Sequence, residues 1–299
     1  MNNALIHPVI RSWHGWIPLI LLPLAVVGLF PVDGPKWALM WSLAGAIYIG
    51  CKWLTWRRTP RCNAPLWKHL GYLLAWPGLD AATFLRAAMP LELRRCSFGE
   101  WLFAVGKTLL GMATLFVLPS LVPSHYPVLV GWIGMVGIVM TLHFGLFHVL
   151  SCLWRSAGVN ARPLMNEPLA STGISEFWGR RWNTAFRDIT NRFLFRPLTA
   201  RYGATIALFA SFLASGLIHD LVISVPARAG YGGPTLFFVV QSLAIFASRS
   251  KLGRSLGLET GVQGRLFTAI VLLAPLTFLF HRAFVLDIMV PFMKAVGAL

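Results

Sequence analysis

The chain has 299 residues, of which 57% are hydrophobic and only 12% are charged, and its mean hydropathy is +0.67. Soluble domains carry about 25% charged residues, so this composition excludes an ordinary soluble protein and predicts an all-α polytopic membrane protein. The net charge of +16 does not indicate a nucleic-acid partner, because Lys and Arg stand in short clusters between apolar runs, as in the cytoplasmic loops of membrane proteins.

The apolar runs predict about seven to eight transmembrane helices. We expect spans at residues 17–30, 37–56, 101–121, 128–150, 203–225, 234–247 and 266–286, with a short tail at 288–299 that only grazes the membrane. The first run lacks a small-x-small cleavage site and is read as a retained span, not a signal peptide. Residues 60–100 alternate short apolar stretches with arginines, which predicts interfacial helices on the cytoplasmic side.

Positive charge orients this arrangement. One side would hold the N-terminus with Arg11 and residues 56–100, 151–202 and 249–265, which together carry 20 of the 26 Lys and Arg residues. The positive-inside rule then places the N-terminus in the cytoplasm. The expected location is the bacterial inner membrane, or the endoplasmic reticulum in a eukaryote. With no repeat or linker, we expect one membrane-embedded domain over 1–299, with a motif core at about 160–225.

The four cysteines form no Cys-x-x-Cys pair, so a zinc site is not expected. Cys51, Cys62, Cys96 and Cys152 all fall near span ends on the predicted cytoplasmic side, where free, reduced thiols are the expectation.

A polar, aromatic stretch follows the fourth predicted span. It reads Glu167-Pro-Leu-Ala-Ser-Thr-Gly-Ile-Ser-Glu-Phe-Trp-Gly-Arg-Arg-Trp-Asn183. A helix is predicted to begin near Ser175, with Thr172, Gly173 or Ser175 itself as N-cap. Glu176, Gly179 and Asn183 would then share one helical stripe, and Phe177, Trp178 and Trp182 would anchor the helix. A purely structural amphipathic helix is the alternative.

The second stretch, Ser215-Gly-Leu-Ile-His-Asp220, lies inside an apolar run. An ionisable residue within a span is expensive and marks a candidate functional site, so His219 is the first choice for a proton acceptor. Ser215 and Gly216 share its face and would leave room for a substrate; a histidine that only packs against another helix is the alternative. Asp220 points elsewhere and would hold a neighbouring helix or lie near the far interface. His143, His148 and His281 are expected to bond neighbouring helices and not a metal.

The run Glu-Phe-Trp-Gly-Arg-Arg-Trp-Asn at 176–183, followed by Ser-Gly-x-x-His at 215–219, resembles the wax synthase-like branch of the membrane-bound O-acyltransferases. Trp-Pro-Gly-Leu-Asp at 76–80 with Phe84-Leu85 is similar to a further segment of that branch. The resemblance implies that Asn183 and His219 are the catalytic pair, with Asn183 orienting a substrate or the imidazole and His219 as base. It also implies a long-chain acyl-CoA donor and a fatty or other lipophilic alcohol as acceptor.

The expected function is therefore O-acylation with acyl-CoA as co-substrate and no cofactor. The other candidate substrate-binding residues are Glu176, Trp178, Gly179, Arg180, Trp182, Ser215 and Gly216. Arg180 and Arg181 suit the phosphates of coenzyme A, although the positive-inside rule explains them more simply. The expected partners are these two substrates and membrane lipids. A transporter of a lipophilic substrate, or a non-catalytic membrane protein on the same fold, is the alternative function.

Overall fold

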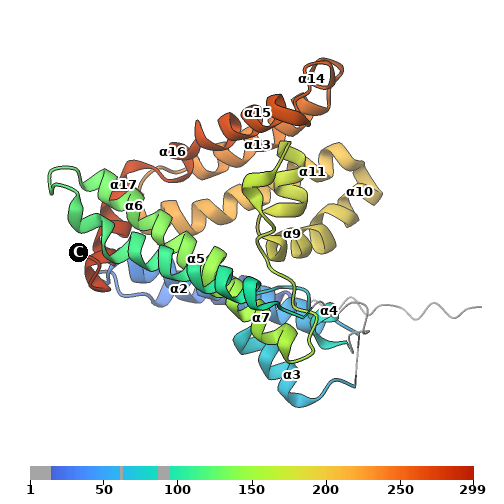
Figure 1. Ribbon diagram of the computed structural model, residues 1–299, viewed down its shortest axis with the longest axis horizontal. Helices are drawn as coiled ribbons and strands as arrows, with labels where there is room; N and C mark the ends of the chain where they lie inside the picture. Colours follow the sequence, from blue (N-terminus) through green and yellow to red (C-terminus); the bar gives the residue numbers. More distant parts are fainter. Residues whose placement is uncertain (1–14, 61–62, 87–94) are drawn as a thin grey trace, which may run out of the picture.

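The computed structural model describes residues 15–60, 63–86 and 95–299, and every regular element within these ranges is helical (Figure 1). The all-α prediction is confirmed for this part of the chain. Arg11, Arg61 and Arg94, three of the 20 basic residues assigned to one side, and Cys62 lie outside the described residues.

Four helical stretches are long and apolar enough to cross a bilayer: Phe98–Leu121, Pro127–Ser156, Ala204–Ala227 and Gly261–Leu279. Only 17–22% of the most apolar window of each is buried against other protein. Such extensive exposed apolar surface is stable in lipid and not in water, which identifies an integral membrane protein. These stretches contain α5 (Phe98–Phe116), α6 (Pro127–Val139), α7 (Phe147–Ser156), α11 (Ala204–His219), α12 (Val225–Ala227), α15 (Gly261–Leu273) and α16 (Leu276–Leu279).

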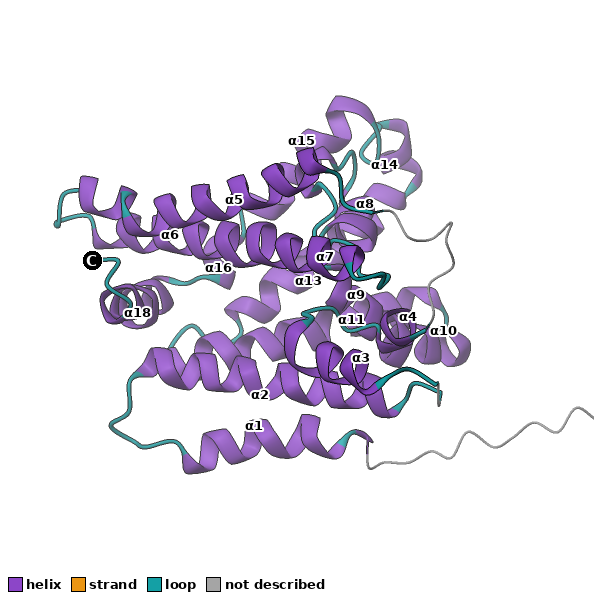
Figure 2. Cartoon of the chain, turned by 60° about the horizontal axis from the view of Figure 1, so that its bottom comes forward, coloured by secondary structure: helices purple, strands orange, loops and turns teal. Residues whose placement is uncertain are grey.

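The remaining long helices fall at three further predicted spans. Helix α1 (Ile17–Leu29) packs beside α2 (Lys36–Arg57), as Figure 2 shows, and α13 (Gly233–Arg249) packs against α11. Helix α1 has 13 residues and α13 has 17, so each is shorter than the roughly 20 residues of a full crossing.

Short helices gather at one end of the bundle, and both views agree on this (Figures 1 and 2). They follow the basic stretches: α3 (Leu66–Leu70), α4 (Ala81–Leu85), α8 (Ile174–Glu176), α9 (Thr184–Thr190), α10 (Arg196–Tyr202) and α14 (Lys251–Ser255). The α5–α6 connection with the 3-10 turn η4 (Leu118–Leu121), and the C-terminal helices α17 (Arg282–Phe284) and α18 (Val290–Ala295), lie at the other end. The basic loops therefore share one end, as the charge pattern predicts.

Wide π-helical turns interrupt many of these helices. Within the described ranges they are η2 (Gly71–Ala75), η5 (Met140–Leu146), η7 (Phe177–Arg181), η8 (Asn191–Phe195), η9 (Asp220–Ser224) and η10 (Val285–Met289), and a 3-10 turn, η6, spans Pro168–Ala170. Such turns contain one more residue than an α-turn and occur often at functional sites. Three of them, η2, η7 and η9, adjoin or overlap the motif stretches.

Lys52 of α2 clamps the Trp-Pro-Gly-Leu-Asp stretch onto the bundle. Its side chain is 2% exposed, and Nζ donates to the carbonyls of Tyr72 at 2.7 Å and Gly78 at 2.6 Å. The Tyr48 hydroxyl donates to the carbonyl of Trp76, and Asp80 caps α4 by accepting from the Thr83 N–H. Trp76, Leu79, Phe84 and Leu85 thereby enter the same hydrophobic core as Ala185 and Ile189 of α9. The Trp-Pro-Gly-Leu-Asp stretch therefore shares a core with α9, the helix that follows the 167–183 stretch.

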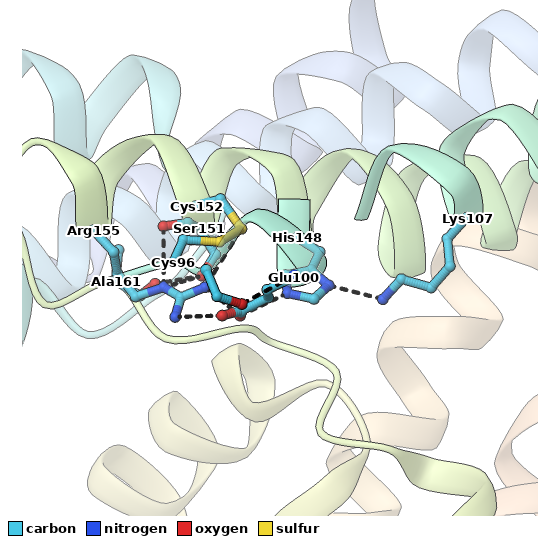
Figure 3. Close-up of a disulfide and its surroundings, with 9 residues drawn as sticks. Cys96, Glu100, Lys107, His148, Ser151, Cys152, Arg155 and Ala161 are labelled. Carbon is cyan, nitrogen blue, oxygen red and sulfur yellow. Dashed lines mark hydrogen bonds and ion pairs between the residues drawn. A yellow bond between two sulfur atoms is a disulfide. The ribbon is translucent and has the colours of Figure 1, made fainter. Parts of the chain in front are cut away.

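Cys96 and Cys152 form a disulfide, so the expectation of free thiols is wrong for this pair (Figure 3). Cys96 stands just before the N-cap of α5, and Cys152 lies on α7, 56 residues later. Sequence alone does not bring them together because their proximity depends on how α5 packs against α7. Cys51 is free and buried.

A polar network continues along α5 and α7 beside the disulfide (Figure 3). Arg155 donates to both carboxylate oxygens of Glu100, and the His148 Nε2–H donates to Glu100 Oε1 at 3.0 Å. Lys107 Nζ lies 2.8 Å from His148 Nδ1, which therefore accepts. His148 thus bonds a neighbouring helix, as predicted.

Candidate active site

The motif helix begins at Gly173, one of the three predicted N-caps, and Glu176 ties down its first turn. Glu176 Oε2 accepts from the Thr172 N–H at 2.8 Å, and Arg181 Nε donates to Glu176 Oε1 at 2.8 Å. The Thr172 N–H, with the Arg181 guanidinium, holds the pKa of the Glu176 carboxyl below its usual range. Arg181 also donates to the carbonyls of Asn166 and Glu167. Glu176 and Arg181 therefore organise the motif loop.

The predicted stripe of Glu176, Gly179 and Asn183 on one helix is wrong. Residues 177–181 form a π turn closed by the Trp182 N–H, which donates to the Phe177 carbonyl at 2.9 Å. Trp182 is then extended, and Asn183 has left-handed backbone angles (φ 39°, ψ 64°). The helix therefore ends before Asn183, and helical spacing does not apply across this break.

Asn183 starts the next helix, α9, as its N-cap. Its Oδ1 accepts from the Phe186 N–H at 3.5 Å, and its backbone N–H points to the Met165 sulfur at 3.3 Å. Asparagine tolerates left-handed geometry better than most residues and is a strong N-cap, so this residue type suits the break. The N-cap hydrogen bond uses Oδ1 and does not involve the amide nitrogen Nδ2.

Gly179 and Arg180 form the exposed side of the π turn. A side chain at Gly179 would meet no atom within 4 Å, and its carbonyl accepts from Arg187 Nη1 at 3.1 Å. Of the two motif arginines, Arg181 is engaged in holding the loop and Arg180 extends outward at the basic end of the bundle.

The aromatic residues of the motif point into the core. Trp182 stacks on Phe177 and contacts Phe144 of η5. Trp178 packs edge-on against Phe212 of α11 and also against Phe238 of α13, with both centroid distances 5.7 Å. Trp178 and Trp182 thus anchor the motif through contacts with other spans, as predicted.

His219 is the last residue of α11, and its ring orientation is set from two sides. Nδ1 lies 2.7 Å from the Ser215 carbonyl oxygen, so Nδ1 carries the hydrogen and donates it. The ring centroid lies 4.5 Å from that of Phe238. In the neutral ring this arrangement leaves the lone pair on Nε2, the tautomer that a proton acceptor requires.

The room expected beside His219 at Gly216 is taken by another helix. An added Cβ at Gly216 would lie 2.6 Å from the Thr235 Cα, so the glycine permits close packing of α11 on α13. Ser215 bonds the Ser211 carbonyl through its hydroxyl. Both small residues therefore serve the helix contact and the imidazole support.

Asp220 holds a neighbouring helix, which was one of its two predicted roles. Its carboxylate accepts from the backbone N–H groups of Gly232 at 2.9 Å and Thr235 at 3.0 Å, and from the Thr235 and Ser224 hydroxyls. This fixes the start of α13, the helix that supplies Phe238.

Two of the candidate residues, Trp178 and His219, are connected through an aromatic side chain. Trp178 and His219 both contact Phe238, and Asn183 follows Trp178 by five residues. No hydrogen bond joins Asn183 to His219 among the described residues. The structure therefore brings Trp178 near His219. The pairing of Asn183 with His219 rests on the family resemblance alone.

Two other histidines differ from expectation. His281 caps its own helix α17 by accepting from the Phe284 N–H at 3.2 Å, so the prediction that it bonds a neighbouring helix is wrong. The Nδ1 of His143 in η5 is buried without a hydrogen-bond partner. Sequence spacing could not foresee these environments, because both depend on local turns.

Gln241 and Lys52 are buried polar residues that the sequence motifs do not include. Gln241 is fully buried in α13, where its Oε1 accepts from Trp178 Nε1 at 3.4 Å. The available signal was a long polar side chain within each apolar run, because such a group needs a hydrogen-bond partner inside a membrane.

Comparison with known proteins finds a family model that matches the motif region. Residues 161–240 match the model described as the membrane bound O-acyl transferase family. The probable long-chain-alcohol O-fatty-acyltransferase 7 of Arabidopsis thaliana is 29% identical over 99 residues, or 30% of this chain and 29% of that protein. The long-chain-alcohol O-fatty-acyltransferase of Simmondsia chinensis is 34% identical over 80 residues, or 24% of this chain and 23% of that protein.

A relative named for a sterol acceptor matches over a similarly short segment. Acyl-CoA–sterol O-acyltransferase 1 of Arabidopsis thaliana is 33% identical over 67 residues, or 20% of this chain and 19% of that protein. The chain thus spans 19–29% of the length of these three curated relatives. Since both motif stretches lie inside the matched segment, the resemblance seen in the sequence is confirmed: residues 161–240 match the model of the membrane bound O-acyl transferase family, and the chain is similar over part of its length to long-chain-alcohol O-fatty-acyltransferases.

Proposed function

We propose that this protein is a membrane-bound acyltransferase that moves a fatty acyl group from acyl-CoA to the hydroxyl of a lipophilic alcohol, giving a wax-type ester. The family match and the O-acyltransferase names of the relatives support this reaction class. Those names include both a long-chain alcohol and a sterol, so the acceptor is proposed as a class of apolar alcohols.

The observation that carries the proposal is the tautomer of His219. Its Nδ1–H is bonded to the Ser215 carbonyl, so Nε2 is the ring nitrogen that can accept a proton. The Ser215 carbonyl also favours the imidazolium that forms, because it accepts a hydrogen bond that strengthens when the ring becomes charged.

The proposed reaction needs one base and no covalent enzyme intermediate. The alcohol hydroxyl gives its proton to His219 Nε2 while its oxygen attacks the thioester carbonyl carbon, and the carbonyl π electrons move to oxygen. The tetrahedral intermediate collapses, the carbon–sulfur bond breaks, and the imidazolium returns the proton to the coenzyme A sulfur. Acyl-CoA is the co-substrate, and this chemistry requires no cofactor.

Asn183 is proposed as the donor to the developing oxyanion. Its Oδ1 is used in the N-cap, which leaves the two Nδ2 hydrogens for a substrate oxygen. Arg180, exposed at the basic end, suits the coenzyme A phosphates.

We also propose seven to eight spans with the basic end in the cytoplasm, in a bacterial inner membrane or the endoplasmic reticulum. The charge asymmetry supports this orientation. Single-cysteine variants at positions 57, 180 and 251 should all label from the cytoplasmic side; external labelling at position 180 with position 57 protected would exclude it.

The test is an assay of the purified full-length protein with a panel of acyl-CoAs and alcohols. Coenzyme A release that depends on the alcohol supports acyl transfer, whereas a transporter or non-catalytic protein would release none. His219→Ala should lower turnover about 10²–10⁴-fold, the usual contribution of positioned proton transfer.

Two matched variants separate chemistry from structure. His219→Gln keeps a hydrogen-bonding group but cannot take a proton at neutral pH, so it should be nearly as inactive as His219→Ala. Asn183→Gly keeps the left-handed backbone and loses the amide together with its N-cap hydrogen bond, and glycine at an N-cap costs only about a few tenths of a kcal/mol. A drop in activity with a nearly normal melting temperature therefore supports the oxyanion role. A well-folded His219→Ala protein with native turnover would overturn the mechanism.

A further inference from the structure

Gln241 has a polar side chain that is completely buried. It lies on α13 and is 0% exposed, between core residues such as Phe237, Phe238 and Ile245. A primary amide offers two donors and an acceptor, and a buried polar group without partners costs several kcal/mol in an apolar medium. The partners of this amide therefore define what it does.

The amide nitrogen of Gln241 supplies a hydrogen bond that a neighbouring helix, α15, lacks near its C-terminal end. Its Nε2 donates to the Val271 carbonyl at 2.9 Å. In a regular helix this carbonyl would accept from residue 275, but that residue is Pro275, which has no N–H. The amide is thereby oriented with its nitrogen toward α15 and its oxygen toward the motif.

The acceptor side reaches the motif tryptophan. Gln241 Oε1 accepts from Trp178 Nε1 at 3.4 Å, and the indole packs between Phe212 and Phe238. Phe238 in turn packs against the His219 ring at 4.5 Å between centroids. A continuous series of contacts therefore leads from the proline-freed carbonyl to the imidazole.

We propose that Gln241 is a positioning residue for acyl transfer: it holds Trp178 in the orientation that keeps Phe238 against the His219 ring. The inference rests on the proposed function, in which His219 is the base. The Ser215 carbonyl restrains the ring through Nδ1, and Phe238 restrains it through its face. Displacement of a catalytic group by about 1 Å can cost 10²-fold in rate, so loss of this restraint should lower kcat more than it raises KM.

The experiment separates the repair of α15 from the restraint on the motif. Gln241→Met keeps the length of the side chain and removes both hydrogen bonds, so kcat should fall about 10-fold or more and the melting temperature should also fall. Adding Pro275→Ala returns a backbone N–H to the Val271 carbonyl. This double variant should regain the melting temperature and keep the low kcat. If it regains both, Gln241 is only structural and the proposal is wrong.

A second cycle tests the path through Trp178. Trp178→Phe removes the indole N–H and keeps an aromatic ring, so it should lower kcat similarly to Gln241→Met. The two changes together should cost less than the product of their separate effects, since they act on one restraint. Fully multiplicative effects would contradict the path.

Two controls isolate the inference. Gln263→Met makes the same change at an exposed position of α15 and should leave kcat unchanged. His219→Ala is assayed in parallel: if it retains native turnover, the proposed function fails, whereas an inactive His219→Ala beside a fully active Gln241→Met refutes the positioning role alone.

Discussion

Lys52→Met should destabilise the protein by about 2–4 kcal/mol. The side chain is 2% exposed, and its nitrogen makes short hydrogen bonds to two buried carbonyls, those of Tyr72 and Gly78. Methionine fills the volume of the aliphatic stem but donates nothing, and each buried carbonyl left without a partner costs about 1–3 kcal/mol. Relief from burying the amine offsets part of this loss, which brings the sum to the stated range.

The assay is thermal unfolding of the purified protein in detergent. A loss of this size should lower the melting temperature by roughly 5–10 °C. Lys294→Met is the matched control, because Lys294 is exposed near the C-terminus and its loss should change stability by no more than about 0.5 kcal/mol. Protease sensitivity should increase around residues 71–80, since Lys52 holds that stretch. If Lys52→Met melts with the wild type, the two hydrogen bonds do not stabilise this region and the reasoning fails.

Three further outcomes follow from individual contacts. Reduction of the Cys96–Cys152 disulfide should lower the melting temperature, since closing a loop of 56 residues contributes up to about 4 kcal/mol by chain entropy, and a Cys96→Ser/Cys152→Ser protein should be insensitive to reductant. Gly216→Ala should destabilise because its Cβ would meet the Thr235 backbone, whereas Gly45→Ala, in open space on α2, should be neutral or stabilising by up to about 1 kcal/mol; equal effects would contradict the packing account. Because the pKa of Glu176 is lowered, its contribution is fully present above the ordinary carboxyl pKa of about 4.3 and is lost as the pH falls through the folded value. The melting-temperature advantage of the wild type over Glu176→Gln should therefore shrink as the pH falls from 6 to below 4, and a constant advantage would contradict this.

Long-range composition and periodicity predict the helices well because they reflect burial in lipid over many residues. The apolar runs at 128–150 and 203–225 correspond to described helical stretches, and the basic loops meet at one end as the charge pattern predicts. The sequence motifs also lie in the segment that the family model matches, residues 161–240.

The geometry inside the site could not be predicted from spacing, because it depends on local breaks. Residues share one stripe of a helix only at 3.6 residues per turn, and the π turn at 177–181 with the left-handed Asn183 ends that regularity. Gln241 illustrates a second limit. Its proposed role depends on Pro275 in the turn between α15 and α16, and only the packed structure shows that the Val271 carbonyl, which this proline cannot bond, accepts from the Gln241 amide.

The π turn also determines how the motif can change in length. The closing hydrogen bond runs from the Trp182 N–H to the Phe177 carbonyl, so it requires five residues from Phe177 to Arg181 but makes no demand on the side chain of Gly179, which faces open space. A Gly179→Ala protein should therefore keep the turn. Deleting Gly179 would convert it to an ordinary α-turn and rotate Asn183 relative to Trp178 by about one residue, or 100° of helix. Insertions and deletions in this segment are thus expected to be more damaging than substitutions at its centre.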